Sequence, residues 1–205
     1  GIPLFLSSTV TRIFGEGRIE GVNVGKVDKD LKIIPGTERF VKCDTLLLSV
    51  GLIPENELSK KAGIKINELT GGAVVDSHLQ TSVEGIFSCG NVLHIHDLAD
   101  HASLEGEKAG YFAAKYIESK GERYGRYRVS FCDKIRYALP NCIVEDGEPV
   151  SISFRIKRPT RNTVLTVKDR EDILIKRKFV RLLPSELVQI KLEKEIKSDI
   201  YLEIE

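Results

Sequence analysis

Several features that mark common classes of protein are missing from this sequence. No apolar run reaches the roughly 20 residues that a membrane-spanning helix needs. The first six residues are apolar but carry no basic side chain and are too short for a signal peptide, so we expect none among them. The formal net charge is only +1, which gives no electrostatic reason to expect a nucleic-acid partner.

The cysteine pattern excludes a further class. The chain has four cysteines and no Cys-x-x-Cys pair, so a thioredoxin-like dithiol centre is not expected. Cys43 and Cys89 sit within apolar strand patterns, which is typical of free thiols in a reducing compartment. A disulfide between Cys132 and Cys142 stays open as an alternative. We expect a cytoplasmic protein with free cysteines.

A short apolar run, residues 86–89, ends at Gly90 and organises the first 120 residues. Its pattern predicts a buried strand, followed by a loop over residues 92–101 and a helix over residues 103–117. Open α/β sheets bind phosphates and cofactors where a strand ends against a helix N-terminus. A second apolar run, residues 45–50, also ends at a glycine, with a proline three residues further on.

Shorter elements fill the rest of this region. A hairpin turn is expected at Gly15 and Gly17, and a short helix over residues 55–62, which Pro54 precedes and Gly63 ends. The remaining expected strands are residues 4–6, 10–14, 18–24, 38–41 and 73–75.

The helix over residues 103–117 carries two glycines, Gly106 and Gly110, on one face with small side chains. Each glycine costs about 1 kcal/mol relative to alanine inside a helix. One explanation is close approach to a sheet or to a flat ligand. The other is a plain helix that packs tightly on a sheet with nothing bound.

After residue 121 the pattern changes to strands separated by turns, which favours a small antiparallel sandwich. The expected strands are residues 150–156, 163–167, 172–180, 187–192 and 200–204. Basic clusters at residues 157–161 and 176–178 fit either a solvated face or a docking surface for an acidic partner.

Two glycine motifs, residues 45–54 and 81–91, resemble those of two-domain flavoprotein reductases in the pyridine nucleotide-disulfide oxidoreductase superfamily. Within it, the chain most resembles NAD/FAD-dependent oxidoreductases found alongside anaerobic glycerol-3-phosphate dehydrogenase, and more distantly the α subunit of sarcosine oxidase. Residues 89–98 and 135–140 carry this narrower resemblance.

The resemblance implies a partial α/β FAD/NAD-binding fold followed by a small antiparallel β-sandwich. Residues 1–43 would end the NAD-binding domain, residues 44–121 would form the C-terminal half of the FAD-binding domain, and residues 122–205 would be a β-rich extension. The superfamily's Gly-x-Gly-x-x-Gly loops are absent, and the chain contains no methionine, even at position 1. We therefore expect a C-terminal fragment that by itself binds FAD and NAD(P)H weakly or not at all and is inactive.

The function implied for the full-length protein is that of an FAD-dependent NAD(P)H oxidoreductase. It would pass hydride between nicotinamide and flavin, and electrons to a partner redox protein or dehydrogenase subunit. The alternative is a non-catalytic assembly or partner-binding module with a remnant dinucleotide-binding fold.

The resemblance also assigns cofactor contacts. Asn91 stands where the superfamily has an aspartate that hydrogen-bonds a ribitol hydroxyl of FAD, and an Asx-turn is the alternative role. Backbone N–H groups at the start of the helix would face the flavin. The expected cofactor-binding residues are Gly51, Pro54, Gly90, Asn91, Ala102 and Ser103.

Three of the four histidines lie within eight residues, together with two aspartates: His94, His96, Asp97, Asp100 and His101. By resemblance this loop lines the flavin, and His96 or Asp97 would exchange a proton during flavin reduction. A structural polar loop is the alternative. His-x-His can also suit zinc, but no cysteine or further histidine sits at ligand spacing, so we expect no metal.

Overall fold

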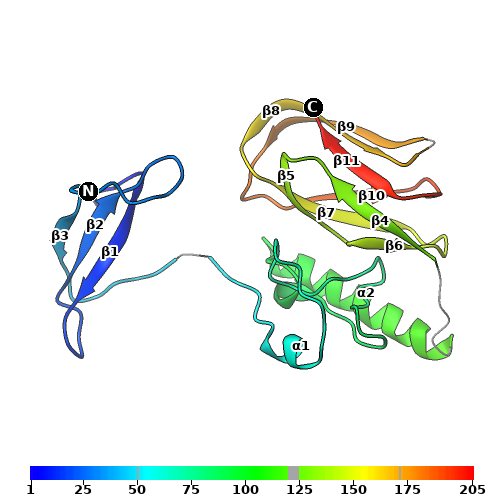
Figure 1. The fold of residues 1–205 in the computed structure, drawn as a ribbon, viewed down its shortest axis with the longest axis horizontal. Helices are drawn as coiled ribbons and strands as arrows, with labels where there is room; N and C mark the ends of the chain where they lie inside the picture. The colour runs from blue at the N-terminus through cyan, green and yellow to red at the C-terminus, as the bar shows by residue number, and fades with distance from the viewer. Residues whose placement is uncertain (50, 120–124, 171) are drawn as a thin grey trace. The chain divides into compact units, whose positions relative to one another are not determined.

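The computed structural model describes residues 1–49, 51–119, 125–170 and 172–205. The chain divides into two compact units, Gly1–Gly51 and Leu52–Glu205, and each is described by itself (Figure 1). The expected boundary between residues 121 and 122 lies outside the described residues. In the described part of the chain, no helix has the length and apolar character to cross a membrane.

The first unit is a three-stranded antiparallel sheet in the order β1-β2-β3. Its strands are β1 (Ser8–Phe14), β2 (Gly21–Lys26) and β3 (Arg39–Lys42). The expected hairpin turn is confirmed. Gly15 adopts φ +123°, and a Cβ there would lie 2.0 Å from the carbonyl oxygen of Arg18, so this turn requires glycine.

Two expected strands of this unit are wrong. Residues 4–6 lie outside the strands, and Leu4 and Leu6 are largely exposed. Residues 45–49 form no strand either, and Leu47 is 90% exposed; Val50 lies outside the described residues. An apolar run becomes a buried strand only when neighbouring strands supply ladder hydrogen bonds, and none of the described strands pairs with these segments.

The described residues of the second unit form two α-helices, one 3₁₀ turn and two sheets. The helical elements are α1 (Glu57–Lys61), η1 (Gly90–Val92) and α2 (Ala99–Glu118). The strands are β4 (Arg126–Phe131), β5 (Ile135–Leu139), β6 (Cys142–Val144), β7 (Val150–Ile156), β8 (Thr160–Lys168), β9 (Ile173–Leu182), β10 (Val188–Leu192) and β11 (Ile200–Ile204). One sheet has the order β10-β7-β5 and the other β6-β4-β11-β8-β9.

The expected antiparallel sandwich is confirmed in outline. All five strands predicted after residue 150 are present, and β7 and β11 match their predicted bounds. One pairing, β11 with β4, is parallel. Strands β4, β5 and β6 were not expected, because their sequences mix arginine, cysteine and short apolar runs without clear alternation.

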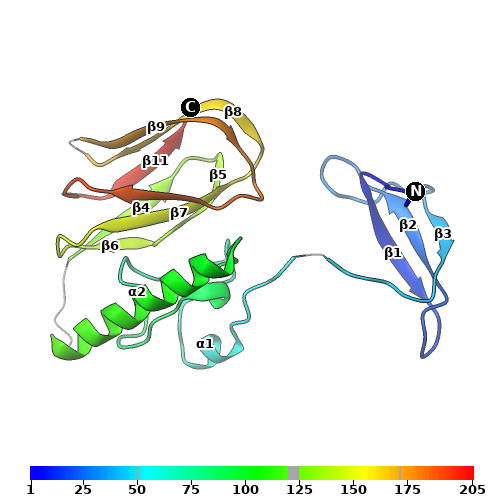
Figure 2. The same ribbon diagram turned by 180° about the vertical axis from the view of Figure 1, so that it is seen from behind.

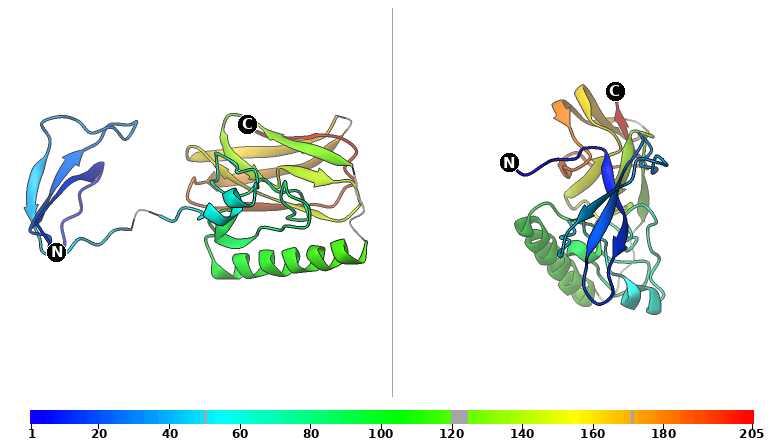
Figure 3. Two further views of the ribbon diagram at one scale, coloured as in Figure 1. Left: turned by 60° about the horizontal axis from the view of Figure 1, so that its bottom comes forward. Right: turned by 90° about the vertical axis from the view of Figure 1, so that its left-hand side faces the viewer.

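Two apolar cores hold this unit together. The larger lies between the two sheets and includes Phe154, Leu165 and Leu202, all completely buried. The smaller joins the segment before α2 to the sandwich, since Leu93 and Ala109 pack with Tyr137 of β5. Figures 1, 2 and 3 agree that α2 lies along one side of the sandwich.

The expected strands at residues 73–75 and 86–89 are reduced to isolated bridges, Ile66 with Ala73, Val75 with Thr81, and Gln80 with Phe87. Just after the first of these segments, Asp76 makes a single parallel bridge to Cys142 of β6, so the segments form isolated bridges and no continuous strand. The helix expected from residue 103 begins at Ala99 instead.

The glycines of α2 do not approach a sheet. A Cβ built on Gly106 or Gly110 would have no neighbour within 4 Å, so this part of the expectation is wrong. The buried residues of α2 are Ala109 and Phe112, and they mark its packed face. The glycine face is open among the described residues.

Candidate functional site

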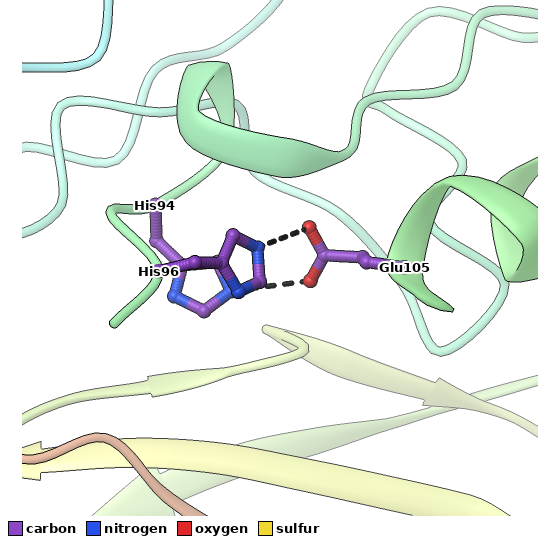
Figure 4. A group of neighbouring side chains, drawn as sticks. All are labelled: His94, His96 and Glu105. Carbon is purple, nitrogen blue, oxygen red and sulfur yellow. Dashed lines mark hydrogen bonds and ion pairs between the residues drawn. The ribbon is translucent and has the colours of Figure 1, made fainter. Parts of the chain in front are cut away.

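The segment between η1 and α2 brings two histidine side chains toward one carboxylate. We call residues 93–98 the histidine loop. Gly90 adopts φ +71°, and the backbone N–H of His94 donates to its carbonyl oxygen at 3.2 Å, which turns the chain. Figure 4 shows the rings of His94 and His96 pointing toward Glu105, which projects from α2.

The three side chains form close, paired contacts, and we call them the His–Glu cluster. Nε2 of His94 lies 3.1 Å from Oε1 of Glu105, and Nε2 of His96 lies 3.0 Å from Oε2. The side chains of His94, His96 and Glu105 are 1%, 2% and 14% exposed. The cluster is therefore almost completely shielded from water.

The protonation of the cluster follows from these contacts. Burial by itself raises the pKa of the Glu105 carboxyl, but hydrogen bonds from His94, His96 and the Gly90 N–H outweigh it and hold that pKa below its usual value. Because the carboxylate is ionised, each Nε2 that faces it carries a proton. Neither Nδ1 has a hydrogen-bond partner among the described residues.

Asp97 is bound to the sandwich and not to the cluster. Its carboxylate accepts hydrogen bonds from the Arg155 guanidinium and, at 2.7 Å, from the backbone N–H of Leu187. Burial opposes ionisation, but these donors and the charge of Arg155 keep the pKa of Asp97 below its usual value. Arg155 also donates to the carbonyl oxygen of Ile95 at 3.1 Å and to the Tyr137 hydroxyl at 3.0 Å.

Gly90 and Asn91 contact the same cluster. The N–H of Gly90 donates to Oε2 of Glu105 at 2.6 Å. The side-chain oxygen of Asn91 accepts the backbone N–H of His96 at 3.0 Å, so in this structure the amide orders the histidine loop. A Cβ on Gly90 would have no neighbour within 4 Å, which leaves open space beside this backbone.

Ala102 and Ser103 lie in the first turns of α2 and not at its start. The N-cap is Leu98, whose backbone is extended. No side chain caps the N-terminus of the helix. The Ser103 hydroxyl donates to the carbonyl oxygen of Ala99 at 3.2 Å. The unsatisfied N–H groups of an α-helix belong to its first turn, so here they begin at Ala99.

The other two expected cofactor contacts fall in different units. Gly51 adopts φ +88° with open space around it, and it ends the first unit. Pro54 belongs to the second unit, where its ring lies 3.7 Å from the position of a Cβ on Gly71.

Sequence reasoning missed three residues of this site. Glu105 looked like an acidic residue of an ordinary first helical turn, and only the fold brings it to the histidines. Tyr137 and Arg155 lie on strands far along the chain. In β7, Arg155 follows Ser151 and Ser153 at the polar positions of the alternation, so nothing in the sequence indicated that it is buried and paired.

Comparison with known proteins identifies relatives that match part of the chain. Thioredoxin reductase of Treponema pallidum is 31% identical over 114 residues, which cover 55% of this chain and 34% of that protein. The CoA-dependent NAD(P)H sulfur oxidoreductase of Pyrococcus abyssi is 27% identical over 125 residues, covering 58% of this chain and 25% of that protein. A nitric oxide reductase FlRd-NAD(+) reductase of Salmonella agona is 31% identical over 70 residues, which are 34% of this chain and 18% of that protein.

Among solved structures, T. acidophilum thioredoxin reductase matches with 31% identity and a TM-score of 0.47, covering 57% of this chain and 37% of that chain. The chain spans about a quarter to a third of the length of the first curated relatives. The family model described as pyridine nucleotide-disulphide oxidoreductase matches residues 1–106, more than half of the 205 residues. The chain therefore belongs to the pyridine nucleotide-disulphide oxidoreductase family.

Proposed function

We propose that this protein works as an FAD-dependent NAD(P)H oxidoreductase, to which this chain contributes part of the flavin-binding surface. Membership of the family supports the reaction class. The names of the relatives support it too, since they describe oxidoreductases and reductases of NAD(P)H, NAD(+) or thioredoxin. In this proposal, hydride passes between nicotinamide and flavin, and electrons continue to a partner redox protein or dehydrogenase subunit.

The observation that carries the proposal is the empty space beside the backbone of Gly90. The N-terminus of α2, which no side chain caps, belongs to the same unit. No described atom lies within 4 Å of a Cβ on Gly90, so a ligand has room to approach the main chain. The N-terminus of the 20-residue helix α2 offers N–H groups and a partial positive charge to an electron-rich ligand. These residues fit FAD, which supplies the hydride-accepting chemistry when bound.

Each predicted site residue has a role in this proposal. Asn91 donates from its amide to a ribitol hydroxyl while its oxygen orders the histidine loop. His96 exchanges a proton, because its ring already carries one toward Glu105. Asp97 holds the loop in place through Arg155. Ala102 and Ser103, in the first turns of α2, lie beside the flavin in this proposal.

The finer parts of the proposal rest on the narrower resemblance. We propose that the electron acceptor is a dehydrogenase of the glycerol-3-phosphate or amine type and that the protein is cytoplasmic. Residues 1–205 alone are proposed to be inactive, with weak or no binding of FAD and NAD(P)H, because the Gly-x-Gly-x-x-Gly loops are not among them.

The test compares the flavin content of the protein purified from its source with the flavin content of a Gly90→Ala variant. A methyl group at Gly90 enters the open space and strains a positive φ, so we expect the visible flavin bands to be lost or strongly reduced. Gly147→Ala is the matched control, because Gly147 has φ +77° and the same open surroundings. It should keep its flavin.

A colourless native protein would overturn the proposal and favour the alternative, a non-catalytic module that binds partner proteins. Equal flavin content in the Gly90→Ala and Gly147→Ala proteins would leave the oxidoreductase class standing. It would remove Gly90 from the cofactor site.

A further inference from the structure

We propose that His94, His96 and Glu105 form a binding site for a divalent transition-metal ion, and that Zn²⁺ is the ion that fits this donor set. Their ligand atoms all lie within 4.8 Å of one another. Two imidazole nitrogens and one carboxylate oxygen are a donor set that binds Zn²⁺ in proteins, with a fourth position left for water or substrate. The inference is independent of flavin binding.

The spacing of the three donors is close to that of ligands around one ion. Ligands about 2.1 Å from a tetrahedral zinc ion lie roughly 3.4 Å apart. The present Nε2-to-oxygen distances from the His–Glu cluster are 3.1 and 3.0 Å. Each histidine therefore needs to move only a few tenths of an ångström from its own carboxylate oxygen to admit an ion. The full set of ligand atoms lies within 4.8 Å, so the donors must also adjust to one another to share a single ion.

The protonation state also permits the ion. A histidine that ligates metal through Nε2 must carry its proton on Nδ1. In His94 and His96 both Nδ1 atoms are buried and without a partner among the described residues, so each nitrogen has a free position for that proton. Metal binding through Nε2 then requires each ring proton to sit on Nδ1, where the structure leaves a free position.

The surroundings hold the donors in place before an ion arrives. The Gly90 N–H fixes Oε2 of Glu105, as a hydrogen bond normally does for a ligating carboxylate. Asn91 fixes the backbone of His96, and Arg155 binds the carbonyl oxygen of Ile95 between the two histidines. A preorganised, buried set of donors loses little conformational freedom on binding.

Binding an ion would change what the site can do. With Nε2 of His96 bonded to metal, that nitrogen can no longer exchange a proton. The metal and the proposed proton transfer are therefore competing states of one side chain. The open fourth position would offer Lewis-acid chemistry at the same place.

The experiment titrates metal-free chain 1–205 with Zn²⁺ in a calorimeter and with Co²⁺ in an absorption spectrometer. We expect one ion per chain and, for Co²⁺, the visible bands of a four-coordinate site. The Glu105→Gln variant should bind at least about 100-fold more weakly, since even outer-shell changes at metal sites cost 10- to 100-fold. His101→Gln is the matched control, because His101 lies outside the cluster, and it should bind as wild type.

A measurement on the unaltered chain covers the case in which Glu105→Gln fails to fold. Nitrogen-15 NMR distinguishes the two tautomers of each histidine. Saturating Zn²⁺ should move the proton of both His94 and His96 from Nε2 to Nδ1. Absence of saturable binding, unchanged affinity in folded Glu105→Gln, loss of binding in His101→Gln, or persistence of the Nε2–H tautomers would each overturn the proposal.

These outcomes are separate from those for flavin. The metal titration uses no flavin, and the Gly90→Ala comparison measures only flavin bands. If the native protein lacks flavin but the chain binds Zn²⁺, the metal site is supported and the proposed oxidoreductase function is rejected.

Discussion

Arg155 on β7 donates a hydrogen bond to the carboxylate of Asp97, 58 residues earlier in the histidine loop. The same guanidinium binds the Ile95 carbonyl oxygen and the Tyr137 hydroxyl. Burial raises the pKa of Tyr137, so its hydroxyl stays protonated and can accept from Arg155 Nε. Through these contacts the sandwich positions the loop that carries the His–Glu cluster.

We predict that Arg155→Met lowers the free energy of unfolding of the chain by about 2 kcal/mol. It leaves Asp97 and the Ile95 carbonyl oxygen without their donor, which costs more than a surface pair because Arg155 is buried. The estimate is below the cost for a fully buried pair because the Asp97 side chain is 34% exposed. Urea denaturation measures the change.

Arg158→Met is the control for that prediction. Arg158 is exposed and follows the same strand, so its replacement should change the free energy of unfolding by less than about 0.5 kcal/mol. Equal losses in the two variants would show that Arg155 does not hold the loop to the sandwich.

We predict that Gly110→Ala stabilises the chain by roughly 0.5–1 kcal/mol. Alanine is the better helix former, and a Cβ at this position meets no atom within 4 Å. Gly72→Ala should instead destabilise by several times that amount, on the order of 2–4 kcal/mol, because its Cβ would lie 1.7 Å from the carbonyl oxygen of Leu93. Thermal unfolding of both variants checks the pair.

The Gly110 variant also separates the two explanations for the glycine face of α2. If a flat ligand or another protein segment covers that face, Gly110→Ala will weaken its binding in the protein purified from its source. If Gly110→Ala is stabilised and its flavin content is unchanged, the flavin does not contact the glycine face of α2. A destabilised variant contradicts the open surroundings of Gly110.

We predict that Asp76→Asn changes how stability depends on pH. Burial raises the pKa of Asp76 above its ordinary value of 3.8, despite the nearby Arg126 guanidinium and the N–H groups of Gln80 and His78. A raised carboxyl pKa means that the folded state holds the proton more tightly than the unfolded state. The favourable contribution of the protonated carboxyl is therefore lost as pH rises from 3.8 through the raised folded value.

Asparagine removes that loss and keeps the oxygen that accepts the N–H groups of His78 and Gln80. The stability of Asp76→Asn relative to wild type should therefore increase with pH across this window. Asp133→Asn, at an exposed position, should follow wild type at every pH. Parallel curves for wild type and Asp76→Asn in urea titrations would contradict the prediction.

Some parts of this protein follow from its sequence because the signals are local. Alternation in residues 150–156 gives β7, and the glycines at 15 and 17 give the hairpin between β1 and β2. Family membership also follows from the motif at residues 81–91, which lies within the matched region. In each case a few neighbouring side chains decide the backbone conformation.

Other parts depended on contacts between distant segments. The apolar runs at residues 45–50 and 86–89 predicted buried strands, but the described part of the chain gives them no sheet to join. The roles of Glu105 in the His–Glu cluster and of Arg155 at the histidine loop could not be read from the sequence either. Spacing reveals ligands on one segment, whereas Glu105 comes from a helix and Arg155 from a strand of the sandwich.

The sequence by itself determined the family, the five sandwich strands after residue 150 and the position of the histidines, because each is encoded in a short pattern. Only the tertiary structure decided that His94 and His96 face Glu105, and that Arg155 binds Asp97. The physical reason is that burial removes these groups from water. Each must then find its partner in whichever segment the fold brings near it.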